Sequence, residues 1–493
     1  MQERENVANS AVECGTACLE LEFDEDGQAK RTGTWLSASA HIITAVIGSG
    51  VLSLTWAVAQ LGWLAGTLSL FAFAVITWFA AWLLADSNRP DPTTGKRNHV
   101  YMDVVRSNLG GFRVTFCGIA QYTNLVGVSI GYTITAAMSM VAVVRSNCLH
   151  KYGHDAGCHI SYYPYMIIFG AIQLIFSQIP NFHKLSFLSY LASIMSFTYA
   201  TIGIGLAIAK VSSEGNHVET SLGGTKVGID VSAADKIWKI FQSLGNIAFT
   251  YTFSNVLVEI QASSFMNSFF SVGVSDTIQT TPAKPAHKAM KKASTVGIFV
   301  TTLFYALCGL VGYAAFGNNA PGNFLSDGFT EPYWLIDFAN VCIAVHLMGA
   351  YQVFAQPLYQ IVEKKCAEKW PESGFIMNTY PIHIPMCGKP EFNLFHLVWR
   401  SAYVAVMSLV AIILPFFNDF VGLMGALAFW PLTVFLPIEM YIARQKLRRF
   451  SVPWICLQTL SMLCLIVSIL ATVASINGLV KSLKAFKPFH SVS

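Results

Sequence analysis

Two histidines lie inside long apolar stretches of this chain, His41 in the stretch 36–60 and His346 in the stretch 334–361. An imidazole changes its charge near physiological pH, and an ionisable side chain at membrane depth usually serves a function. We therefore expect His41 and His346 to bind and release protons within a membrane. The alternative is a neutral imidazole that is satisfied by a backbone carbonyl.

Small residues interrupt the first of these stretches soon after His41. Gly48, Ser49 and Gly50 stand among apolar residues near the middle of the segment. Since glycine costs about 1 kcal/mol relative to alanine in a helix interior, the helix either unwinds here or packs closely on a neighbour. The two-residue spacing of the glycines departs from the four-residue repeat of close-packing faces and favours unwinding. Amides freed in this way, at the start of the next helical half, can bind an anion.

A comparable interruption is present in the apolar stretch 237–260. Polar and aromatic residues alternate between Gly245 and Asn255, at membrane depth. Paired interruptions at corresponding positions of two five-helix halves are typical of transporters built from inverted repeats, which bind their substrate near the midplane. Together the two interruptions favour such a transporter.

The elements that must position these groups are transmembrane helices. Of the 493 residues, 54% are hydrophobic and 12% are charged, against roughly 25% charged in a soluble domain. Helices are expected because hydrocarbon offers no partner to an open backbone. We predict an all-α integral membrane protein with about eleven spans. They are expected at 36–60, 62–85, 114–144, 163–179, 185–209, 237–260, 295–316, 334–361, 396–416, 420–442 and 453–476.

Lysine and arginine are distributed unevenly between the two sides that these spans define. With the N-terminus in the cytoplasm, the inner segments carry 21 of these residues and the outer segments carry 8, as the positive-inside rule requires. We predict a disordered cytoplasmic tail over 1–34, a transporter domain over 35–476 and an extracellular tail over 477–493.

The loop 145–162 lies outside the cell in this orientation, where a disulfide can persist. We predict that Cys148 pairs with Cys158; two free thiols are the alternative. Glu259 at the inner end of the sixth span and Asp337 near the outer end of the eighth are candidate gate or relay groups, although terminal carboxylates more often face water.

Several motifs extend over most of the chain from Gly33 onward. They are Gly33-Thr34-Trp35, Ala45-Val46-Ile47-Gly48-Ser49-Gly50-Val51-Leu52-Ser53-Leu54, Ala57-Val58-Ala59-Gln60-Leu61-Gly62-Trp63, Gly245-Asn246-Ile247-Ala248-Phe249, Gly312-Tyr313-Ala314-Ala315-Phe316-Gly317, Ala320-Pro321-Gly322-Asn323-Phe324-Leu325, Ile336-Asp337-Phe338-Ala339-Asn340 and Tyr351-Gln352-Val353-Phe354. These motifs resemble the plant amino acid permease family, part of the amino acid/auxin permease group.

The resemblance implies a LeuT-like fold, a 5+5 inverted repeat with one extra helix. It also implies proton-driven uptake of amino acids at the plasma membrane, with the proton as coupling ion and no other cofactor. His41 and His346 match histidines of the family pattern, and in LeuT-like carriers the first and eighth spans meet at a cation site.

An amino acid substrate needs donors for its carboxylate and acceptors for its ammonium group. We expect the amides of Gly48, Ser49 and Gly50 to supply the donors and backbone carbonyls of the sixth span to supply the acceptors. The predicted substrate-binding residues are Ile47, Gly48, Ser49, Gly50, Tyr122, Asn124, Ala248, Phe249, Tyr251 and Phe253. We expect Tyr122, Asn124, Phe253 and residues of the eighth span to lie near the substrate side chain. Because this recognises what all amino acids share, a broad neutral specificity is our hypothesis.

One segment departs from the family pattern. The family continues from Glu259-Ile260-Gln261 directly into an Asp-Thr pair, whereas this chain has residues 262–275 before Asp276-Thr277. The inserted segment is uncharged and rich in phenylalanine, which is unusual for a cytoplasmic loop. We interpret it as a retained intron fragment or an unusual splice form that affects transport.

Other functions fit the sequence less well. An auxin-type importer of the same group and an amino acid sensor that does not transport remain alternatives. A channel would need a continuous polar pore, and an enzyme would need a clustered acid, base and nucleophile or a metal motif. The spans contain neither pattern. The small net charge of +4 gives no indication of a nucleic-acid partner.

Overall fold

The computed structural model describes residues 34–88, 98, 100–153, 157–179, 186–213, 218–254, 257–258, 286–381 and 391–485. Four of the sequence predictions therefore lie wholly or partly outside the described residues: the N-terminal tail up to residue 33, Glu259, the inserted segment 262–275, and the C-terminal tail from residue 486.

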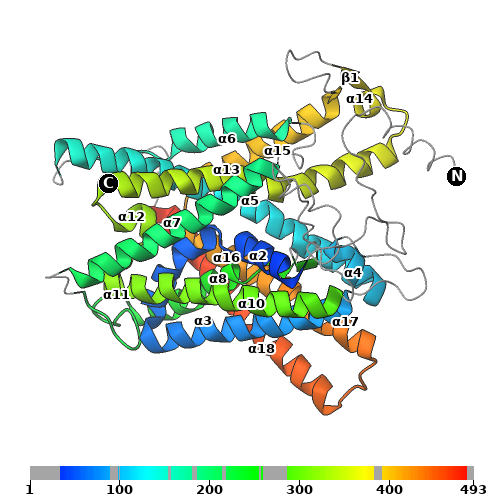
Figure 1. Ribbon diagram of the computed structural model, residues 1–493, viewed down its shortest axis with the longest axis horizontal. Helices are drawn as coiled ribbons and strands as arrows, with labels where there is room; N and C mark the ends of the chain where they lie inside the picture. The colour runs from blue at the N-terminus through cyan, green and yellow to red at the C-terminus, as the bar shows by residue number, and fades with distance from the viewer. Residues whose placement is uncertain are drawn as a thin grey trace.

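Long helices make up nearly all of the described chain (Figure 1). The longer helical elements are α2 (Trp35–Val46), α3 (Leu54–Ser87), α4 (Tyr101–Asn108), α5 (Phe112–Tyr152), α6 (Tyr163–Ser177), α7 (Ser186–Ser212), α8 (Ala233–Thr250), α10 (Ala286–Ala306), α13 (Tyr333–Lys369), α15 (Leu394–Ile413), α16 (Phe417–Ala428), α17 (Leu436–Gln445) and α18 (Val452–Ala485). Short elements join them: η1 (Ser49–Ser53), η4 (Leu307–Val311), α11 (Gly312–Phe316), η5 (Gly317–Asn319), α12 (Phe324–Gly328), α14 (Gly374–Met377) and η6 (Phe429–Phe435).

Each of the expected spans overlaps a helix of the structure. Eight helical stretches in the described part are long and apolar enough to cross a membrane by themselves, and α6 is a shorter apolar helix. The helices of the first and sixth spans fall outside that set, α2 because it has only 12 residues and α8 because its 18 residues include Asp235, Lys236 and Lys239. The chain is thus a multi-pass membrane protein, and the two interrupted spans are the ones predicted from sequence.

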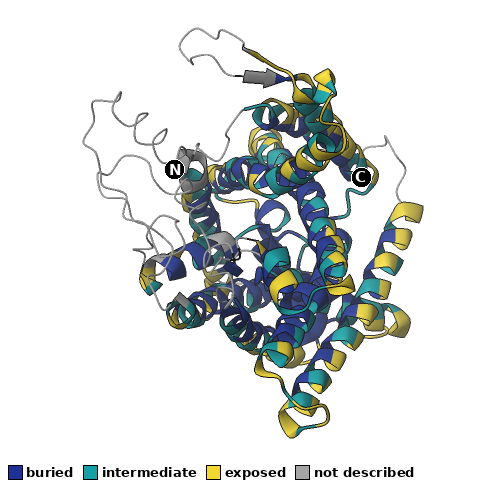
Figure 2. Cartoon of the chain, turned by 90° about the vertical axis from the view of Figure 1, so that its right-hand side faces the viewer, coloured by how far each residue is buried: buried dark blue, intermediate teal, exposed yellow. Residues whose placement is uncertain are grey.

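The helices form a buried centre with a lipid-exposed rim. Figure 1 shows α2, α8 and α16 in the middle, between α5 and α13 on one side and α3 and α10 on the other. Figure 2 shows the same gradient, with buried segments inside and exposed ones at the edge. In the most apolar part of the stretch Phe417–Gln445, 78% of the residues are buried within the bundle, against 22% in that of Leu394–Ile413. The interrupted helices therefore lie where a binding site is shielded from lipid.

Gly62 separates the first span from the second within α3. Its φ of +79° is a conformation that only glycine adopts readily, and the chain turns there. A Cβ on Gly62 would lie 2.1 Å from the Gly224 nitrogen. The segment around Gly224 closes this end of the bundle, since the amide of Trp63 donates to the Ser221 carbonyl (3.2 Å) and the amide of Thr225 donates to the Ala59 carbonyl (3.1 Å).

The end of α5 is tied to the segment that follows it by a disulfide and to α12 by an ion pair. Cys148 and Cys158 form a disulfide. Arg145 contacts Asp327 at 3.1 Å and donates to the Ser326 carbonyl at 2.8 Å. At the opposite end, a short antiparallel pair, β1 (Thr379–Pro381) and β2 (Glu391–Asn393), precedes α15.

Candidate functional site

The first interruption separates α2 from η1. Helix α2 ends at Val46, and Gly48 has an extended backbone with φ −132° and ψ −157°. Helical structure resumes at Ser49 and continues to Ser87. The first amides of a helix have no partner within it and carry a partial positive charge. This interruption therefore presents donors at the centre of the bundle, as the glycines predict.

The second interruption follows Thr250 at the end of α8. The Ala248 carbonyl accepts from the Tyr251 amide (3.2 Å) and from the Thr252 hydroxyl (2.8 Å), so both of its lone pairs are used. The Phe249 carbonyl accepts from the Thr252 amide at 3.2 Å. Residues 251–253 are not helical. The carbonyls of this interruption are thus unequal as acceptors, and that of Ala248 is fully occupied.

A cavity of about 70 Å³ lies between the two interruptions. Its walls come from α2, η1, α5, α8, the segment after α8, and α13. The lining residues are Val46, Gly48, Ser49, Gly50, Asn124, Val128, Tyr132, Phe249, Thr250, Thr252, Phe253 and Phe354. None of these carries a formal charge. A ligand without net charge, whose polar groups meet backbone donors and acceptors, suits this cavity best.

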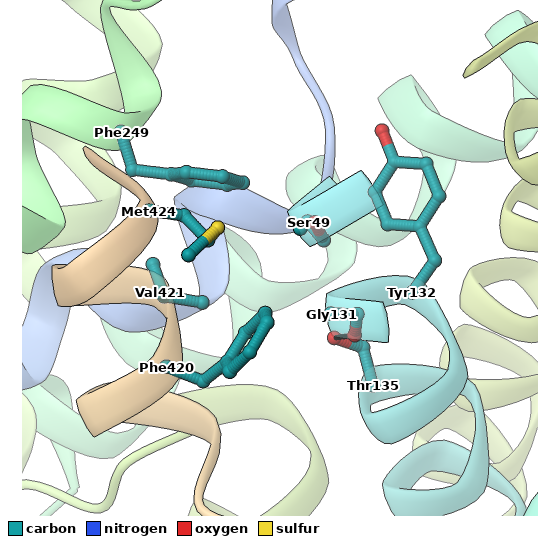
Figure 3. A pocket seen from close by; sticks show the side chains of 9 residues that line it. Ser49, Gly131, Tyr132, Thr135, Phe249, Phe420, Val421 and Met424 are labelled. Carbon is teal, nitrogen blue, oxygen red and sulfur yellow. Dashed lines mark hydrogen bonds between the residues drawn. The ribbon is translucent and has the colours of Figure 1, made fainter. Parts of the chain in front are cut away.

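A narrow hollow adjoins the cavity on the side of α16 (Figure 3). Ser49, Tyr132 and Phe249 line both spaces. Figure 3 shows Phe420, Val421 and Met424 of α16 facing Gly131 and Thr135 of α5, with Phe249 above them. The hollow has no room for a water molecule. These side chains close the cavity on one side.

Comparisons with known proteins agree with this architecture. Residues 31–481 match the family model described as "Transmembrane amino acid transporter protein". Amino acid permease 1 of Arabidopsis thaliana is 60% identical to this chain over 471 residues, which cover 95% of this chain and 94% of that protein. The chain belongs to the transmembrane amino acid transporter protein family. Amino acid permease 8 of the same plant is 58% identical over 98% of each chain.

A solved structure supports the fold of this family member. The crystal structure of MhsT in complex with L-phenylalanine matches with a TM-score of 0.52, over 90% of this chain and 99% of that one, at 11% identity. The identity is low, so the match bears on the fold alone. MhsT has the LeuT fold, and the predicted LeuT-like class is confirmed.

Six of the ten predicted substrate-binding residues line the cavity of this transporter family member: Gly48, Ser49, Gly50, Asn124, Phe249 and Phe253. The other four lie elsewhere. Ile47 is fully buried beside the cavity, and the Tyr251 hydroxyl donates to Thr302 at 3.4 Å. Tyr122 lies 3.4 Å from the Met102 sulfur, and Ala248 lines a separate apolar cavity between α8 and α18.

His346 points toward the first interruption. Its Nδ1 lies 2.8 Å from the Ala192 carbonyl of α7, and since a carbonyl only accepts, Nδ1 carries the proton. Its Nε2 has no hydrogen-bond partner in the described structure, although the side chain is 7% exposed. A Cβ on Gly48 would lie 3.9 Å from that Nε2. A buried imidazole thus directs a lone pair at the interruption.

The other two predicted residues within the described part of the chain, His41 and Asp337, do not line the cavity. His41 is buried in α2, five residues before Val46. Asp337 accepts from the Asn147 side chain at 2.6 Å, near the disulfide and away from the cavity.

Sequence reasoning missed Tyr132 and Tyr305, and it expected Phe354 only as one of the unnamed residues of the eighth span. Tyr132 and Phe354 line the cavity and pack edge to face, with ring centroids 5.6 Å apart. Tyr305 of α10 is fully buried behind it. A tyrosine in an apolar span needs a partner for its hydroxyl. The presence of Tyr132 and Tyr305 in such spans could therefore have indicated a polar contact inside the bundle.

Proposed function

We propose that this chain imports a broad range of neutral amino acids by proton-coupled symport at the plasma membrane, with a cytoplasmic N-terminus and an extracellular C-terminus. Family membership and the names of the relatives, amino acid permeases of a plant, support an amino acid substrate. The excess of lysine and arginine on one side of the spans supports the orientation.

The cavity between the interruptions carries the substrate proposal. The substrate carboxylate binds at the amides of Ser49 and Gly50, where the helix dipole and unpaired donors favour an anion. The ammonium group binds to carbonyls of the two interruptions, and the side chain extends toward Asn124, Val128 and Phe253. The uncharged walls favour neutral amino acids. A cavity of about 70 Å³ holds only a few waters, so larger substrates require Phe249 and its surroundings to move.

His346 carries the proton-coupling proposal. A lone pair that is buried, unpartnered and directed at the first interruption is available to a proton that enters with the substrate. His41, in the same interrupted span, is the second group of this relay.

Competition for uptake tests the substrate proposal. Cells that express the chain are given one labelled neutral amino acid and an excess of unlabelled neutral, acidic or basic amino acids. We expect several neutral amino acids of different size to displace the label, and charged ones to displace it poorly. Displacement by only one amino acid would contradict the broad specificity, and displacement by an auxin-like acid alone would favour a different solute.

A further inference from the structure

Tyr305 joins the two interrupted spans through its hydroxyl. The side chain belongs to α10, is fully buried, and is not among the residues that line the cavity. Its hydroxyl oxygen lies 2.8 Å from the Val46 carbonyl and 3.0 Å from the Thr250 carbonyl. Val46 ends α2 and Thr250 ends α8. One hydroxyl therefore meets the last carbonyls of both half-helices.

This contact has an electrostatic reason. The C-terminal end of a helix exposes unpaired carbonyls and carries about half a negative charge. Two such ends close together repel each other unless a donor or cation lies between them. The hydroxyl has one proton, so it satisfies one carbonyl at a time or is shared between the two. The pair of carbonyls keeps unused acceptor capacity.

The two residues that carry these carbonyls border the cavity. Val46 and Thr250 both line the cavity wall, whereas the Tyr305 ring lies behind them against Tyr251, with ring centroids 5.3 Å apart. A carbonyl oxygen has two lone pairs, and a bond to Tyr305 uses only one. The Ala248 carbonyl differs, because its amide and hydroxyl donors already occupy it.

We propose that Tyr305 is a positioning residue for ammonium recognition, and this inference rests on the proposed function. Its hydroxyl holds the Val46 and Thr250 carbonyls together from behind, so that they face the substrate's ammonium group as one pair of acceptors. The same bond makes the ends of α2 and α8 rearrange together when substrate binds.

The variant Tyr305→Phe removes the hydroxyl and keeps the ring. The matched control is Tyr101→Phe, which also removes a buried phenol that donates to a backbone carbonyl, that of Leu432, at 2.6 Å, but at a residue that does not line the cavity and does not contact the ends of α2 and α8 through its hydroxyl. Uptake is measured against amino acid concentration and divided by the protein at the cell surface. The inhibition constant of an α-hydroxy acid, which has the carboxylate but no ammonium group, is measured on the same cells.

We expect Tyr305→Phe to weaken the apparent affinity for a neutral amino acid about tenfold, because carbonyls that are no longer held together lose about one hydrogen bond to the charged ammonium group. The maximal rate and the α-hydroxy acid inhibition constant should stay near wild type, and Tyr101→Phe should resemble wild type in both. An unchanged amino acid affinity, or an equal loss for both ligands, would overturn the positioning role.

Tyr305→His, which keeps a ring and an N–H donor, is the second variant if the phenylalanine variant does not reach the surface. We expect a smaller loss that is again confined to ligands with an ammonium group. An equal loss for the α-hydroxy acid would overturn the inference. Absence of amino acid uptake by the wild-type chain would instead contradict the proposed function itself.

Discussion

Single residues set how closely the two interruptions approach each other. A Cβ on Gly50 would lie 2.9 Å from Thr250 Cγ2 and 3.1 Å from Phe249 Cδ1, whereas one on Gly48 would lie no closer than 3.9 Å to His346 Nε2. The two glycines look equivalent in the sequence. In the structure only Gly50 lacks room for a side chain.

Gly50→Ala should therefore weaken substrate affinity more than Gly48→Ala. Overpacking of this kind costs about 1–3 kcal/mol, or about a five- to hundredfold loss if it falls on the bound state. Uptake as a function of amino acid concentration, corrected for surface protein, measures both variants. A Gly48→Ala variant with the larger loss would contradict the geometry.

His346→Gln should abolish the acid stimulation of transport. Glutamine keeps a polar side chain of similar reach but does not titrate, so substrate exchange should persist while its dependence on pH is lost. His396→Gln is the matched control. His396 lies near the start of α15, 3.6 Å from Glu363, and does not line the cavity. Acid stimulation of normal size in His346→Gln would exclude this imidazole from proton coupling.

Glycines and histidines in apolar segments identified part of the site from the sequence. The aromatic residues of the site could not be recognised in this way. Glycines and histidines are costly inside a membrane helix, so their presence pointed to function. Tyr132, Tyr305 and Phe354 are ordinary core residues by type. Their importance depends on which carbonyl or ring lies opposite, and that is a long-range property of the fold.

At the scale of elements, the turn at Gly62 connects the first two spans to the segment around Gly224. A side chain at Gly62 would meet both a forbidden φ and a backbone nitrogen at 2.1 Å. Gly205 of α7 has nothing within 4 Å of a built Cβ.

Gly62→Ala should lower stability and the amount of protein at the surface. The strained backbone alone costs about 1–3 kcal/mol, and the clash adds to it. Gly205→Ala should be close to neutral or slightly stabilising, since alanine favours a helix over glycine. The apparent melting temperature of the purified protein measures both. A Gly62→Ala variant as stable as wild type would contradict the described turn.

The positions of the spans were predictable, but α5, α10, α13 and α18 each extend eight or nine residues beyond an expected end. The interruptions were also predictable only approximately. The first was expected around Gly48 to Gly50 and is centred on Ile47 and Gly48. The second was expected anywhere between 245 and 255 and begins after Thr250. Apolar length locates a span, whereas the residue at which it unwinds depends on partners such as Tyr305, which lies more than 50 positions further along the chain.

At the scale of the whole molecule, the links between α5 and the segment before α13 hold one end of the bundle closed. Burial raises the pKa of Asp327, and the charge of Arg145 opposes this rise. Arg145→Gln removes the opposing charge, so the pKa of Asp327 rises further. An ionised carboxyl without its partner is then costly at neutral pH and is relieved by protonation as the pH falls.

Arg145→Gln should therefore destabilise the protein by about 1–3 kcal/mol at neutral pH, and by less under mildly acidic conditions. Apparent melting temperatures of the variant and of wild type across this pH range measure the difference. A deficit that stays constant or grows as the pH falls would show that Asp327 is not the group left uncompensated.

The whole-molecule architecture was predicted from sequence because hydropathy and paired interruptions persist when identity does not. The match to MhsT at 11% identity shows how little of the detail such a fold requires. The inserted segment 262–275 follows the sixth span, outside the described residues. Its effect on transport is measured by comparing the full chain with a chain that lacks it.

One measurement tests the central claim most directly: substrate-induced current and labelled amino acid uptake, at acidic and at neutral pH, in oocytes that express the full chain or a chain lacking residues 262–275. The account predicts an inward current that neutral amino acids evoke and that acidity increases, and a current confined to the shortened chain would mark the inserted segment as disabling. Absence of current and uptake from both chains, despite confirmed surface expression, would contradict proton-coupled amino acid symport.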